Sequence, residues 1–222
     1  MDRQQTDELY HLMRVASNDC TSDELSKLYG LIRHLFCGGD YLSLIQYSAW
    51  YGERYILPEL NELLDNNFKL NTPVRIVELG AGLGWLSRGL CLHYHIDKMI
   101  TVDKRPWGAT TERLNIENKE DRDYLISKYP ADGRTLIVAS EFLHCCDNQK
   151  EIIDAFYDYD MLILEYVGWN EESFKSYQDQ LGRYGAMVPT LPDLRYILGD
   201  RAVFSKDRSI LPYLVAFIGR MP

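Results

Sequence analysis

The stretch from Val74 to Ser87, VRIVELGAGLGWLS, constrains the fold of this chain more than any other. Its first residues are mostly β-branched, which is typical of a buried strand. Glycines follow at every second position, and the segment after them has the composition of a helix. Bare backbone in such a turn lets a ligand approach closely, and the helix N-terminus presents unpaired N–H groups. We therefore expect an α/β fold with a cofactor at this turn.

The spacing of the glycines separates two families of cofactor. The dinucleotide fingerprint G-x-G-x-x-G requires a glycine at position 85, where this chain has Trp85. The spacing present is Glu-x-Gly-x-Gly-x-Gly, which resembles the first motif of the class I S-adenosylmethionine-dependent methyltransferases. The resemblance implies a Rossmann-like fold, in which a mostly parallel, doubly wound sheet carries a C-terminal antiparallel hairpin and an N-terminal helical cap. It also implies that S-adenosylmethionine contacts Glu78, Gly80, Ala81, Gly82 and Gly84.

Composition limits the classes of function. The 222 residues carry a net charge of -9 and give a pI near 5.1, which disfavours binding to nucleic acid or to anionic membranes. No apolar run approaches the ~20 residues of a membrane span, and the N-terminus lacks the apolar core of a signal peptide. Five cysteines without a regular spacing fit a reducing compartment, so we expect a cytoplasmic protein.

Residues 1–72 are expected to form the helical cap and residues 73–222 the methyltransferase domain. The cap contains an aromatic group that includes Tyr47, Trp50 and Tyr51. These rings either dock the cap onto the α/β domain or cover the cofactor and the acceptor, since aromatic rings stack on flat ligands. Both interpretations stay open, and we take the three rings as candidate acceptor-binding residues.

A second strand is expected to end at Asp103, about twenty residues after the glycines. In the resembled family an acid at this position binds the cofactor ribose, which implies that role for Asp103, with Lys104 beside it. Capping of the next helix is the alternative for Asp103. Trp107 is a candidate for stacking on the adenine. The third strand is the least clear, and residues 116–118 are its best position.

Two further buried strands are expected at residues 134–140 and 161–167. In a parallel sheet their carboxyl ends meet at the same edge as the glycine turn. The segment S-E-F-L-H after the first of them resembles the fourth-strand motif of small-molecule methyltransferases. The polar residues at these two strand ends are candidates for contact with cofactor or acceptor: Ser140, Glu141, His144, Glu165 and Tyr166.

Methyl transfer is an in-line displacement from a sulfonium, so the protein mainly aligns the reactants and sometimes accepts a proton. His144 is the best general base by its ordinary pKa, and Glu141 and Glu165 are the other catalytic candidates. Helix capping or a surface position is the structural alternative for these three residues. Cys145 and Cys146 follow His144 without C-x-x-C or H-x-x-x-H spacing, so we expect no metal.

Sequence motifs of nucleic-acid methylation are missing. The chain has S-E-F-L where base-amino methyltransferases have Asp or Asn, Pro, Pro and an aromatic residue, and no cysteine follows a proline. The prediction is an enzyme that methylates an oxygen or nitrogen of a small molecule with S-adenosylmethionine. The alternatives are an NAD-dependent oxidoreductase, a nucleic-acid or protein methyltransferase, and a non-catalytic S-adenosylmethionine-binding module. A homodimer also stays open.

Overall fold

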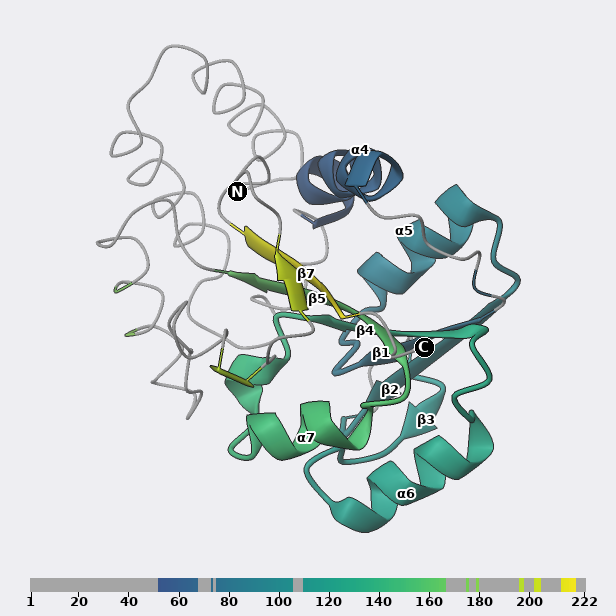
Figure 1. Cartoon of the computed structure of the whole chain (residues 1–222), viewed down its shortest axis with the longest axis vertical. Helices are drawn as coiled ribbons and strands as arrows, with labels where there is room; N and C mark the ends of the chain where they lie inside the picture. The colour runs from purple at the N-terminus through teal and green to yellow at the C-terminus, as the bar shows by residue number, and fades with distance from the viewer. Residues whose placement is uncertain are drawn as a thin grey trace.

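The computed structural model describes residues 52–67, 73, 75–105 and 110–166, together with residues 175, 179, 196–197, 202–204 and 213–218. Its strands are β1 (Arg75–Leu79), β2 (Lys98–Asp103), β3 (Glu112–Arg113), β4 (Thr135–Ser140), β5 (Asp160–Tyr166), β6 (Ala202–Phe204) and β7 (Tyr213–Ile218). Within this part of the chain they form a seven-stranded sheet in the order β3-β2-β1-β4-β5-β7-β6 (Figure 1).

The sheet is parallel over its first five strands and antiparallel over the last two. β1 pairs in parallel with β2 and β4, β2 with β3, and β4 with β5. β7 then lies antiparallel to β5, and β6 antiparallel to β7. The predicted α/β class with a mostly parallel sheet is therefore confirmed. The connection between β6 and β7 lies outside the described residues, so the expected C-terminal hairpin stays a prediction.

The third strand differs from the prediction. β3 is formed by Glu112–Arg113, and the expected strand at residues 116–118 is wrong. That segment turns into helix α6 (Lys119–Lys128), and Asn118 N donates to Asn115 O at 2.8 Å. Ile116 is buried, so its side chain reaches the core from a turn. A single buried apolar residue does not distinguish a turn from a strand.

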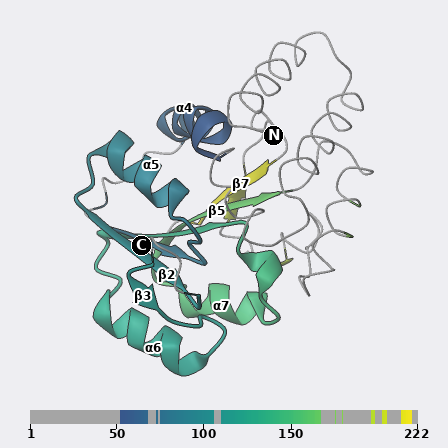
Figure 2. The same cartoon turned by 180° about the vertical axis from the view of Figure 1, so that it is seen from behind.

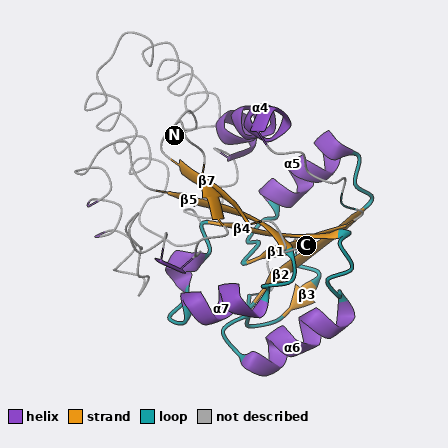
Figure 3. Cartoon of the chain, in the orientation of Figure 1, coloured by secondary structure: helices purple, strands orange, loops and turns teal. Residues whose placement is uncertain are grey.

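Helices cover both faces of the sheet (Figures 1 and 2). Helices α4 (Leu57–Asn67) and α5 (Trp85–Tyr94) lie on one face, and α6 and α7 (Gln149–Ala155) lie on the other. Figure 3 distinguishes these two helical layers from the strands by colour. Because the central strands are buried on both faces, β4 is a continuous apolar run and not an alternating one. The main core cluster lies under α6 and α7 and includes Leu79, Ile137, Ile153 and Phe156.

The π-helix η1 (Gly52–Ile56) leads directly into α4, and both pack against α5. Two glycines permit this close packing. A Cβ on Gly52 would lie 2.6 Å from the Trp85 ring, and a Cβ on Gly89 would lie 2.1 Å from Leu57 Cδ2. Trp85, the residue that breaks the dinucleotide fingerprint, is therefore used to dock η1 onto α5.

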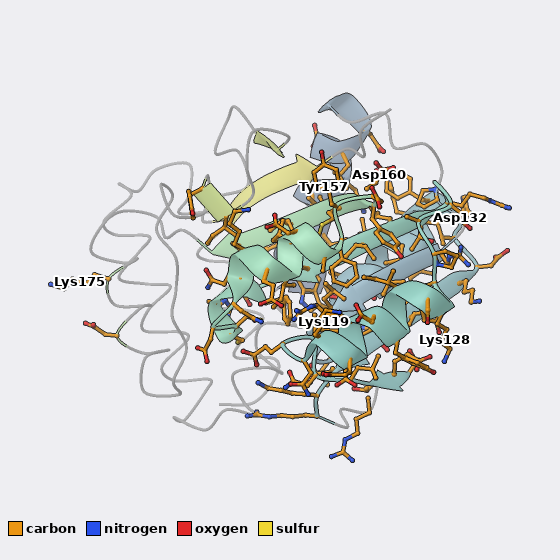
Figure 4. The ribbon with its side chains drawn as sticks, turned by 60° about the horizontal axis from the view of Figure 1, so that its bottom comes forward. Lys119, Lys128, Asp132, Tyr157, Asp160 and Lys175 are labelled. Carbon is orange, nitrogen blue, oxygen red and sulfur yellow. The ribbon has the colours of Figure 1, made fainter. Side chains whose placement is uncertain are left out.

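The parallel strands bring their carboxyl ends to one edge of the sheet, which is where ligands bind in open α/β sheets. Asp132, Tyr157 and Asp160 lie at the opposite edge, close to the starts of β4 and β5 (Figure 4). The carboxyl edge therefore holds the candidate site, at the ends of β1, β2, β4 and β5.

Among the described helices, none is long and apolar enough to cross a membrane.

Candidate active site

The glycine turn between β1 and α5 has a backbone that favours glycine at three positions. The φ angles are +62° at Gly80, +52° at Gly82 and +67° at Gly84, all in the left-handed region, where other L-residues are strained. Gly84 N donates to Ala81 O at 2.7 Å, and Ala81 N donates to Val102 O of β2 at 3.0 Å. The turn is therefore tight and is held against the neighbouring strand.

Glu78 lies beneath this turn and is 1% exposed. Its Oε2 accepts a hydrogen bond from Ser87 N at 3.2 Å and another from Ser87 Oγ. The carboxylate thus caps the first turn of α5 from the preceding strand, since Gly84 at the N-cap has no side chain to do so. Burial raises the pKa of the Glu78 carboxyl to about 7, although the bonds from Ser87 oppose the rise.

Asp103 connects the end of β2 to the glycine turn. Its Oδ2 accepts from Gly82 N at 3.0 Å, and its Oδ1 accepts from Arg105 N at 2.8 Å. The structure therefore brings together the two elements that sequence alone placed about twenty residues apart. Lys104, which follows Asp103, directs its Nζ to Glu117 Oε2 at 3.3 Å, and Glu117 is a contact that the sequence analysis did not identify.

The end of β4 lies beside the turn. A Cβ on Gly80 would lie 2.1 Å from Phe142 Cδ2, so the Phe142 ring occupies the space beside that glycine. Glu141 has a φ of +48°, and its N–H donates to Leu164 O of β5 at 2.8 Å. The Oγ of Ser140 is buried and has no hydrogen-bond partner among the described residues. A buried hydroxyl without a partner is costly, so this atom is suited to bind a polar ligand.

Glu165 at the end of β5 organises the segment that follows β4. Its Oε1 accepts from Phe142 N at 3.0 Å and from Leu143 N at 2.8 Å. Its Oε2 lies 3.2 Å from Nδ1 of His144, which sits in the short 3-10 helix η2 (Leu143–Cys145). The two predicted catalytic candidates His144 and Glu165 are therefore in contact, although 21 positions separate them in the sequence.

His144 and Glu165 form a buried pair, with 5% and 1% exposure. Burial pulls the pKa of His144 down, but its interactions with Cys145 and Glu165 outweigh burial and hold the pKa well above its ordinary value. The imidazole therefore favours its protonated form, with the Glu165 carboxylate as its counter-ion. In the described part of the chain, no group of three or more His, Cys, Asp or Glu side chains is arranged to bind a metal ion.

Some predicted site residues cannot be placed in this geometry. Tyr47, Trp50, Tyr51 and Trp107 lie outside the described residues, as does the side chain of Tyr166. The sequence analysis missed Ser87, Phe142 and Glu117 as parts of the site. Ser87 carried a weak signal, because a hydroxyl in the first turn of a helix after a glycine motif suits a capping interaction.

No family model matches the sequence, and no curated protein sequence matches it either. The structure is similar to a protein assigned as an O-methyltransferase from Nostoc punctiforme PCC 73102, with a TM-score of 0.55 and 9% identity over 79% of this chain. It is also similar to NcsB1, an O-methyltransferase from neocarzinostatin biosynthesis, with a TM-score of 0.50 and 12% identity over 81% of this chain. This chain spans 58% of the first protein and 57% of the second.

The sheet order, the glycine turn and these similarities define one class of fold. The chain has the Rossmann-like fold of the class I S-adenosylmethionine-dependent methyltransferases, as the glycine spacing predicted. NcsB1 was solved with S-adenosyl-L-homocysteine and 1,4-dihydroxy-2-naphthoic acid.

Proposed function

We propose that this chain binds S-adenosylmethionine at the glycine turn and transfers its methyl group to an oxygen or nitrogen of a small molecule. The observation that carries the proposal is the turn from Glu78 to Gly84, closed on Asp103 by the 3.0 Å bond from Gly82 N. That turn stands at the carboxyl end of β1, in the fold that class I methyltransferases share.

Three features of the described residues fit this cofactor. The left-handed glycines leave the backbone of the turn without side chains. The Oγ of Ser140 is a buried hydroxyl without a hydrogen-bond partner in the described part of the chain. The carboxyl of Glu78 is buried with a pKa of about 7, so a cationic ligand nearby would favour its charged form.

The residues of the carboxyl edge have separate roles in this proposal. Asp103 holds the ribose hydroxyls, because a carboxylate that already accepts two backbone N–H groups keeps further lone pairs for a ligand. The cofactor lies against the backbone of the turn at Gly80, Ala81, Gly82 and Gly84. Its other neighbours are Lys104, Ser140 and Glu141. When bound, S-adenosylmethionine supplies a methyl group on a sulfonium. After transfer of the methyl group, the sulfur leaves as a neutral thioether.

On the acceptor side, alignment carries most of the catalysis. His144 accepts the proton of the acceptor from its neutral form, which the raised pKa confines to higher pH. Glu165 supports this role, since its Oε2 lies 3.2 Å from the Nδ1 of His144 and stabilises the imidazolium. Tyr47, Trp50, Tyr51 and Tyr166 complete the acceptor site. A compact aromatic acceptor agrees with the naphthoic acid held by NcsB1. The cap at residues 1–72, the domain at residues 73–222 and a cytoplasmic location remain parts of this proposal.

Isothermal titration with S-adenosylmethionine, S-adenosylhomocysteine and NAD tests the cofactor. We expect micromolar binding of the first two and none of NAD. In the Gly82→Val variant the branched side chain fills the space of the ligand and is strained at a φ of +52°, so binding should be lost while the circular dichroism spectrum stays close to wild type. Binding of NAD alone, or full affinity in the variant, would contradict the proposal.

Turnover separates an enzyme from a binding module. A screen of hydroxylated and aminated aromatic acceptors, read by release of S-adenosylhomocysteine, should give at least one substrate. Tight cofactor binding without turnover of any acceptor would favour the non-catalytic module.

A further inference from the structure

Glu117 lies where three loops of the carboxyl edge meet. It follows β3, and its carboxylate has a partner in each of the two neighbouring loops. Oε2 lies 3.3 Å from Nζ of Lys104, in the segment after β2. Oε1 accepts a hydrogen bond from Asp147 N at 3.1 Å, in the segment after η2. One side chain therefore connects the exits of β2, β3 and β4.

The backbone that carries Glu117 is itself held firmly. Its carbonyl oxygen accepts from Arg122 Nη1 at 2.9 Å and from Asn148 Nδ2 at 3.3 Å. Arg122 is 2% exposed and also donates to Ile116 O at 2.9 Å. Lys119 marks the start of α6 in Figure 4, two residues after Glu117. The carboxylate thus projects from a fixed turn, which is the condition for a side chain to position others.

Each partner of Glu117 lies within three positions, along the sequence, of a residue of the proposed site. Lys104 follows Asp103, the proposed ribose ligand, and Asp147 comes three residues after His144, the proposed proton acceptor. We propose that Glu117 is a positioning residue that sets Asp103 and His144 at their working separation on the two sides of the cofactor. This inference rests on the proposed function, because it assigns Glu117 a role in cofactor binding at the same site.

The two arms of the carboxylate contribute unequally. The side chains of Lys104 and Glu117 are 50% and 23% exposed, and an exposed ion pair contributes little because water screens it. The hydrogen bond from Asp147 N comes from the main chain and is charge-assisted, so it holds the segment after η2 directly. An amide at position 117 keeps an acceptor for this N–H and loses the attraction for Lys104.

A graded series of variants tests the inference. Glu117→Ala removes both arms, and Glu117→Gln removes only the charge. Glu120→Ala is the matched control, because Glu120 is an exposed glutamate of α6 that, among the described residues, makes no hydrogen bond to the loops after β2 or η2. Binding of S-adenosylhomocysteine and of 5′-methylthioadenosine, which represents the nucleoside half alone, is measured by titration calorimetry alongside thermal melting.

We expect Glu117→Ala to weaken the binding of both ligands by roughly tenfold, Glu117→Gln by about threefold, and Glu120→Ala by less than about twofold. If Glu117→Ala no longer melts cooperatively, and so does not fold, the ligand affinities of Glu117→Gln are compared with those of the same control instead. Affinities within about twofold of wild type in both Glu117 variants, or an equal loss in Glu120→Ala, would overturn the inference. A wild-type protein that binds neither ligand would instead refute the proposed function, so the two failures are distinguishable.

Discussion

The buried carboxyl of Glu78 gives the clearest quantitative prediction. Burial raises its pKa from the ordinary 4.5 to about 7 in the folded protein. Between these values the folded state holds a proton that the unfolded state has released, so the free energy of unfolding falls as the pH rises. The stabilisation is complete below the unfolded pKa and is lost once the pH passes the folded pKa. At about 1.4 kcal/mol for each pKa unit, the loss amounts to about 3 kcal/mol.

The Glu78→Gln variant isolates this effect, because the amide mimics the protonated carboxyl and does not titrate. Urea unfolding of both proteins from about pH 4 to about pH 8 should show the wild type losing about 3 kcal/mol relative to the variant. Glu120→Gln, at an exposed position on α6, is the control, and its difference from wild type should be nearly constant. A constant difference for Glu78→Gln as well would refute the argument that burial under the glycine turn controls this carboxyl.

Two other variants test the polar atoms of the carboxyl edge. Ser140→Ala removes a buried hydroxyl that has no partner in the described part of the chain. The free energy of unfolding should therefore stay level or rise by up to about 1 kcal/mol. The affinity for S-adenosylhomocysteine, measured by calorimetry, should fall by several-fold. A marked loss of stability would contradict this. Glu165→Gln keeps an Oε1 acceptor for Phe142 N and Leu143 N but removes the charge beside His144. The pKa of His144 should therefore fall in an NMR titration. An unchanged His144 pKa would show that Glu165 does not control it.

Local patterns in the sequence predicted the elements that depend only on local chemistry. The strand at residues 75–79, the left-handed turn and the helix after it follow from β-branched and glycine residues a few positions apart. The ends of β2 at Asp103 and of β4 at Ser140 were recognisable for the same reason, and the predicted end of β5 at residue 167 is one residue beyond the observed end at Tyr166. The short β3 escaped prediction, since two residues carry no periodic signal.

The sequence by itself determined the order of the elements, the position of the glycine turn and the class of cofactor that its spacing favours. Only the tertiary structure decided which side chains meet. The register that sets Ser140 opposite Leu164 brings Glu165 to the segment of His144, and the packing of α5 on β1 brings Ser87 to Glu78. These pairs, like the contacts of Glu117, depend on how separate strands and helices are aligned, and alignment is set by the packing of the whole core.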